Sequence, residues 1–223
     1  MTLEALVLDN GKRRKAIVSE GTGDTYEEME YVNLKSYTKM SRAVHKELME
    51  KHHSNLTEIL KNSNASLLRC RAGNAYICSY CPAKYPDAAD LKAHTLQEHD
   101  GEYHLGVAQR KGIAEYLAKL DITDLCCKLC NSNVETLECF KEHLSDVHGL
   151  HIFTDINNHI LPFKFHGEEL KCCICSAVFD KFKILLEHMH SHYRNYVCNF
   201  CGAGFVNRSG LFRHSSTHEK DDD

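Results

Sequence analysis

The sequence predicts a chain of small α+β modules joined by partly structured insertions, not one large globular domain. The first reason is composition: the 223 residues include no Trp, and their 12 Cys and 16 His gather in clusters. The second is a repeat, because two Cys and two His recur four times at nearly constant spacing. The third is that apolar residues recur at fixed offsets from these Cys and His, as expected when one small structural unit is repeated.

Each repeat has the spacing of a metal site. Two residues separate the Cys, twelve separate the second Cys from the first His, and three or four separate the His. Tetrahedral Zn²⁺ takes four N and S ligands at such spacings, and a site with four protein ligands is structural. We expect four structural zinc ions. The predicted ligand sets are Cys78, Cys81, His94 and His99; Cys127, Cys130, His143 and His148; Cys172, Cys175, His188 and His192; and Cys198, Cys201, His214 and His218.

The apolar positions complete the pattern. Those four residues past the second Cys are Tyr85, Val134, Phe179 and Phe205, and those three residues before the first His are Leu91, Phe140, Leu185 and Leu211. The pattern resembles the two-Cys/two-His (C2H2) zinc finger, which implies a ββα module with Cys on a hairpin and His on one helix face. So small a core does not fold alone, and Zn²⁺ contributes about 10–16 kcal/mol in such peptides.

The resemblance divides the chain into segments. We expect residues 1–35 to be disordered because they are polar and mixed in charge. We expect residues 36–69 to be helical because Met40, Val44, Leu48 and Leu56 fall at helical spacing. The remaining segments are finger one (76–99), an insertion (100–124), finger two (125–148), an apolar insertion (149–169), finger three (170–192), finger four (196–218) and an acidic tail (219–223).

The two insertions carry structure of their own. Residues 107–119 have the pattern of a short amphipathic helix, and residues 149–171 are too apolar for a plain linker. We expect each insertion to pack on the following finger or to extend its hairpin. We also expect chelation to melt each finger independently, because separate small cores share little surface.

The family resemblance implies DNA binding by a helix in the major groove, with the residue before the helix and helical positions 3 and 6 contacting bases. In chain order these residues are Asp87, Asp90 and Ala93; Thr136, Cys139 and Glu142; Lys181, Ile184 and Glu187; and Asn207, Gly210 and Arg213. Arg and Asn make bidentate base contacts, and cations neutralise phosphates. We therefore expect DNA contacts from Asn207, Arg208, Arg213, Lys181 and Lys183.

The distribution of charge restricts the expected DNA contacts mainly to fingers three and four. Between their outermost ligands, fingers one to four carry net charges of −1, −2, 0 and +2, and the whole chain carries −4. The linker between fingers three and four has five residues and no Gly or Pro, unlike the longer linker typical of DNA-wrapping arrays. These observations favour a DNA-binding transcription regulator that uses mainly fingers three and four. Fingers one and two and the N-terminal helix are then expected to bind protein partners.

Two other functions stay open from the sequence. One is a zinc-stabilised protein-interaction scaffold without DNA contact, and the other is RNA binding through exposed aromatic rings. We expect no enzyme activity or small-molecule substrate, because four-ligand zinc sites leave no open position. We also expect no membrane partner, because no apolar run reaches the roughly 18 residues that a membrane span needs. The basic run Lys12, Arg13, Arg14 and Lys15 is typical of nuclear import signals and predicts a nuclear protein. In finger two, Cys126 is an alternative to Cys127 as a ligand.

Overall fold

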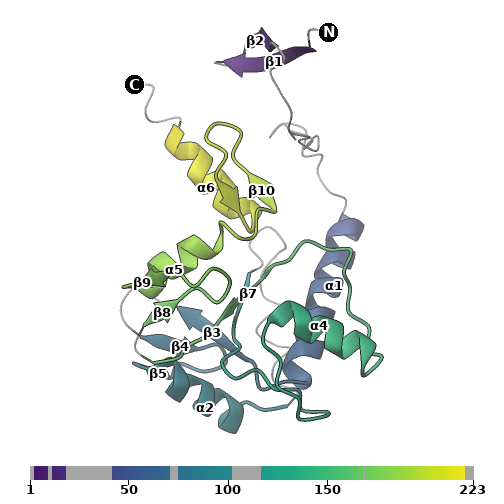
Figure 1. Ribbon diagram of the computed structural model, residues 1–223, viewed down its shortest axis with the longest axis vertical. Coiled ribbons are helices and arrows are strands. Elements are labelled where there is room, and N and C mark those ends of the chain that lie inside the picture. The colour runs from purple at the N-terminus through teal and green to yellow at the C-terminus, as the bar shows by residue number, and fades with distance from the viewer. Residues whose placement is uncertain are drawn as a thin grey trace. The chain divides into compact units, whose positions relative to one another are not determined.

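The computed structural model describes residues 3–9, 12–18, 42–70, 75–101, 117–167 and 169–218. They belong to two compact units, Met1–Ser36 and Tyr37–Asp223, which we treat separately. Figure 1 shows the chain as a ribbon. Among the described residues, no helix combines the length and apolar character that a membrane crossing requires.

The first unit contains a two-stranded antiparallel sheet. Strand β1 (Leu3–Asp9) pairs with β2 (Lys12–Val18), with Leu3 opposite Val18 and Asp9 opposite Lys12. The expectation of disorder over residues 1–35 is therefore wrong for these two strands. The signal that was missed is the Asn10-Gly11 pair between two runs of strand-forming residues, a sequence typical of hairpins.

A five-stranded sheet forms the centre of the second unit. Its order is β5 (Lys84–Tyr85), β4 (Tyr76–Cys78), β3 (Ser66–Cys70), β6 (Ala118–Asp121) and β7 (Ile160–Phe163). All pairs are antiparallel except β6 and β7, which are parallel. The hairpin of finger one thus continues into a strand that precedes it and into one strand from each insertion.

The two faces of this sheet are buried against different partners, because successive side chains of a strand point to opposite faces. Leu67, Leu120 and Ile160 join one core with helices α1 (Arg42–Lys61) and α4 (Leu137–Asp146). Leu68, Leu161 and Phe163 join a second core with α2 (Ala88–Glu98) and α5 (Phe182–Met189). In Figure 1 the sheet lies between α1 with α4 and the finger that contains α5.

Helix α1 is an integral part of the first core. Its buried residues Leu56, Ile59 and Leu60 are at most 2% exposed and pack with finger two. The side-chain amide of Asn55 donates to the carbonyl of Phe153 at 2.7 Å and accepts from its N–H at 2.8 Å, which ties the second insertion to the helix. The helical prediction for residues 36–69 holds for 42–61, but residues 66–70 form β3 because their apolar side chains serve two faces of a sheet.

The insertions pack on the fingers that follow them, as expected, but their strands do not pair with the hairpins of those fingers. Leu120 and Ile122 share a core with Leu137 of finger two, and Phe163 shares one with Phe182 of finger three. Both strands, however, extend the sheet of finger one and not the hairpin of the following finger. Residues 107–116 of the predicted amphipathic helix and the tail 219–223 lie outside the described residues, and Ala118 and Lys119 belong to β6.

Fingers one and three therefore share one core, whereas finger two shares the other core with α1 and the insertions. Finger one contributes Leu91 and finger three contributes Leu185 to the same cluster of buried side chains. A buried ion pair adds to the connection: Lys92 Nζ of α2 lies 3.7 Å from Oδ1 of Asp121 on β6, whose side chain is 3% exposed. Fingers one and three thus lack the separate small cores on which the expectation of independent melting is based, and independent melting itself stays a prediction.

Fingers three and four keep the ββα order. Finger three consists of β8 (Leu170–Lys171), β9 (Val178–Phe179) and α5, and finger four of β10 (Tyr196–Val197), β11 (Gly204–Phe205) and α6 (Arg208–His218). In finger two the hairpin is reduced to an isolated bridge between Cys126 and Asn133. A second bridge joins Ser63 to Cys127, so the end of α1 and finger two are held together through their backbones.

Candidate zinc sites and nucleic-acid surface

Four clusters of two Cys and two His stand out among the described residues, and they are the four sets that the spacing predicts. Within each cluster the ligand atoms all lie within 4.8 Å of one another. The first Cys of each set is buried, at most 1% exposed, whereas the second Cys is exposed in fingers two, three and four. Each site therefore has one Cys in the protein interior, and in fingers two, three and four the other Cys lies at the surface.

The distances between ligand atoms fit a tetrahedral zinc ion. In finger three, Cys172 Sγ lies 3.3 Å from His192 Nε2, Cys175 Sγ lies 3.2 Å from His188 Nε2, and the two Nε2 atoms are 3.1 Å apart. Fingers two and four repeat these separations, between 3.1 and 3.5 Å. Bonds of about 2.0–2.3 Å to a tetrahedral zinc ion place ligand atoms about 3.3–3.8 Å apart. The donors are thus arranged for a zinc ion.

The hairpin turn that carries the Cys is set by its backbone. In finger three the N–H of Cys172 donates to the carbonyl of Ala177 at 2.8 Å, which closes the turn around the metal. In fingers two, three and four the residue after the second Cys has a positive φ: 59° at Asn131, 61° at Ser176 and 72° at Gly202. This left-handed residue turns the chain back toward the helix, a conformation that Gly and Asn adopt most readily.

The aromatic residues at the predicted offset pack against the first His. Ring centroids are 5.1 Å apart for Tyr85 and His94, 4.7 Å for Phe179 and His188, and 4.9 Å for Phe205 and His214. These rings fix the orientation of the imidazole and exclude water from one side of the site. Finger two has Val134 at this offset, and Phe140 stacks on His143 instead, at 6.1 Å.

The thiols differ in how readily they lose a proton in the absence of a cation. Burial raises the pKa of Cys172, so its thiolate needs a cation beside it. The exposed thiol of Cys130 has its pKa lowered to about 6, first by its hydrogen bond with the Ser132 side chain. A bound Zn²⁺ supplies the charge that makes both Cys of a pair thiolates and releases their protons.

The remaining candidates for ligands are used elsewhere. The Sγ of Cys126 donates to the carbonyl of Cys127 at 3.7 Å, so Cys127 is the residue that belongs to the cluster. Cys173 Sγ donates to the carbonyl of Pro162 at 3.3 Å, and burial raises its pKa to about 11. The ring of His190 points to finger four, where Nδ1 accepts from the N–H of Val206 at 3.3 Å.

Four closed Cys2His2 clusters on strand-strand-helix units define the class of the protein. The chain is a C2H2-type zinc finger protein with four structural zinc sites. The family of zinc fingers of the C2H2 type matches the chain at residues 76–99 and 196–218, which are fingers one and four. The chain is also similar to zinc finger and BTB domain-containing protein 21 of Homo sapiens, with 28% identity over 152 residues. The match covers 66% of this chain and 12% of that relative.

The predicted DNA-contacting residues fall into two groups. Arg208 and Arg213 of α6 and Lys181 and Lys183 of finger three are exposed. Asn207 is half-buried, and its side-chain oxygen accepts from the N–H of Gly210 at 2.9 Å. Asn207 is therefore the N-cap of α6, and its oxygen is occupied. Thr136 has the same position in finger two, where it accepts from Cys139 N–H at 3.1 Å.

At the base-reading positions of finger one, Asp87, Asp90 and Ala93 are all exposed. The acidic side chains of this finger thus face solvent and repel a phosphate backbone. The basic run Lys12 to Lys15 lies in β2, paired with residues 6–9 of β1.

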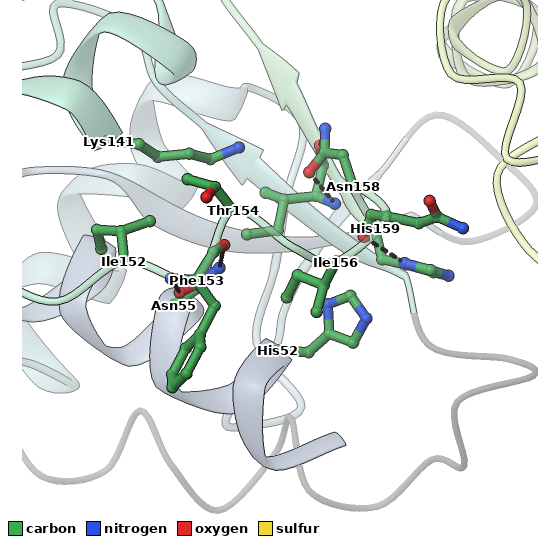
Figure 2. A pocket seen from close by; sticks show the side chains of 11 residues that line it. His52, Asn55, Lys141, Ile152, Phe153, Thr154, Ile156, Asn158 and His159 are labelled. Atoms are coloured by element: carbon green, nitrogen blue, oxygen red, sulfur yellow. Dashed lines mark hydrogen bonds between the residues drawn. The ribbon is translucent and has the colours of Figure 1, made fainter. Parts of the chain in front are cut away.

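A small cavity lies between α1 and residues 152–160 (Figure 2), and its polar groups hold the second insertion in place. Asn158 donates from its amide nitrogen to the carbonyl of Ile160 and accepts from its N–H, both at 3.1 Å. His52 and His159 meet edge to face there, with ring centroids 4.6 Å apart and exposures of 3% and 2%. Burial lowers the pKa of both, that of His52 to about 3. The sequence did not reveal these groups, because none of them follows a ligand spacing.

Proposed function

We propose that this chain binds duplex DNA through fingers three and four and regulates transcription in the nucleus. The observation that carries the proposal is the basic helix α6, which exposes Arg208 and Arg213 on a finger with no acidic residue between its ligands. Phosphate neutralisation supplies much of the affinity of DNA-binding proteins. The C2H2 family and the similarity to a zinc finger and BTB domain-containing protein support the same function.

We propose different contacts for these residues. Arg213, at helical position 6, is proposed to make a bidentate contact with guanine, and Lys181 to offer a single cationic donor. Arg208 and Lys183 are suited to phosphates. Asn207 is a weaker reader than the sequence implied, because a bidentate contact with adenine needs the oxygen that already caps α6.

Selection of duplexes from a random library, followed by titration of the zinc-loaded chain, tests this proposal. Arg213→Ala should weaken binding and relax the preference at one base pair, an effect of about 1–3 kcal/mol. Arg208→Ala should weaken all sequences alike and reduce the salt dependence by about one charge. Arg69→Ala, which removes an exposed Arg from β3, is the matched control. The proposal fails if Arg213→Ala and Arg69→Ala behave alike.

We propose a second activity for fingers one and two, which is contact with a protein partner. The exposed acidic residues at the reading positions of finger one support this function, as does the first half of α1, where Val44 is 49% exposed. A partner captured from nuclear extract should remain bound after nuclease treatment and should be lost on Asp87→Lys with Asp90→Lys. If nuclease releases every captured protein, this second function is excluded.

Nuclear import through Lys12, Arg13, Arg14 and Lys15 is also a proposal, supported by the basic run itself. Replacement of all four with Ala should retain a fluorescent fusion of the chain in the cytoplasm. Unchanged nuclear accumulation would show that import depends on other residues.

A further inference from the structure

The connection between fingers three and four is a structured joint. Tyr193 is partly buried against the second core. Arg194 donates to the carbonyl of Gly202 at 2.6 Å and lies across Gly204, where an added Cβ would meet its Cγ at 2.5 Å. Tyr196 and Val197 form β10. Each of these linker residues is thus engaged with a finger, and Gly204 is the residue that permits the close approach of Arg194.

Val206 is the point at which finger four is attached. Its side chain is fully buried and belongs to the second core, together with Leu161 and Phe163 of the second insertion. Its N–H donates to Nδ1 of His190, which lies at the end of α5. Its carbonyl accepts from Nδ2 of Asn195 at 2.9 Å. Every group that this residue offers is therefore used to fix finger four.

Asn195 connects three parts of the chain with one amide. It belongs to the linker, and its Nδ2 donates both to Val206 of finger four and to the carbonyl of Asn158 in the second insertion, at 2.7 Å. A side-chain amide nitrogen has two N–H groups, so the two bonds use its whole donor capacity. Both hydrogen bonds are direct, and an Ala at position 195 could donate to neither the Asn158 nor the Val206 carbonyl.

From these contacts we infer that Asn195 and His190 are positioning residues that hold finger four at a fixed angle to the body formed by fingers one to three. The helix α6 is then presented to DNA already oriented relative to α5, because both are joined through His190, Asn195 and Val206. Arg213 and Lys181 engage the duplex without the entropy loss of ordering a flexible linker. The DNA consequence rests on the proposed function, whereas the fixed angle does not.

The test measures orientation first, with residual dipolar couplings of the full zinc-loaded chain without DNA. In the wild type, amides of finger four should share one alignment tensor with those of fingers one to three. In Asn195→Ala, finger four should acquire a separate, weaker alignment while four zinc ions remain bound. Asn133→Ala, which removes an exposed amide from finger two, should leave the wild-type pattern unchanged.

Duplex affinity is the second measurement. Asn195→Ala should weaken binding about tenfold, the effect of the lost hydrogen bonds, with the base preference retained. A separate tensor for finger four in the wild type would overturn the inference, and so would an unchanged tensor in Asn195→Ala. A third outcome separates the two proposals. If the wild type shows one shared tensor, Asn195→Ala abolishes it, and the wild type binds no duplex, the fixed angle is upheld and the proposed function is rejected.

Discussion

Leu120 offers the sharpest mutational test of the shared core. It lies in an insertion between two fingers, yet its side chain is 0% exposed and packs with α1, α4 and the neighbouring strands. Leu120→Ala removes three carbon groups, each contributing about 0.8 kcal/mol of burial. With the cavity that remains, the free energy of unfolding should fall by about 3–4 kcal/mol.

Chemical denaturation at a fixed excess of free zinc measures this change. Leu129→Ala is the matched control, because Leu129 belongs to the Cys turn of finger two and is 52% exposed. The control should change the free energy of unfolding by less than about 0.5 kcal/mol. If both variants have equally small effects, the insertion is a linker and the shared core does not exist in solution.

Three further predictions concern single groups. Burial lowers the pKa of His52 from 6.5 to about 3, so the unfolded chain takes up the proton first as the pH falls. The free energy of unfolding should therefore decrease as the pH falls from about 6.5 toward 3. Between pH 5 and 6.5, chemical denaturation should show a smaller decrease for His52→Gln than for the wild type. Gly202→Ala should destabilise finger four by about 1 kcal/mol, because φ is 72° and the added Cβ meets no atom within 4 Å. Ser176→Gly should have the opposite sign, by about 0.5–1 kcal/mol, and thermal melts with zinc compare the two.

The zinc sites could be predicted from the sequence because their chemistry is local. Each set of ligands lies within 22 residues, so the spacing alone brings Cys and His together. The aromatic offsets follow from the same short-range geometry, as Tyr85 and Phe179 show.

The body could not be predicted in the same way, since it depends on contacts between distant residues. Leu67 pairs with Leu120 across more than 50 residues, and neither belongs to a finger. Leu67 and Leu68 are adjacent apolar residues that belong to two different cores. If only one buried face is expected, two such neighbours are easily taken for part of an apolar helix. The roles of Asn195 and Val206 could not be predicted from the sequence either. The linker is held by hydrogen bonds from Asn195 to the carbonyls of Asn158 and Val206, and these contacts are visible only in the structure.

The central claim is that fingers one to three share one folded body with the insertions. Hydrogen exchange of the zinc-loaded Cys130→Ser variant tests it most directly. Cys130 is exposed, so the substitution removes a zinc ligand of finger two without changing any buried side chain. We predict that α1, β3 and β6 lose protection together with finger two, while the chain retains three zinc ions. Loss of protection confined to residues 125–148 would contradict the claim and restore the description of independent fingers.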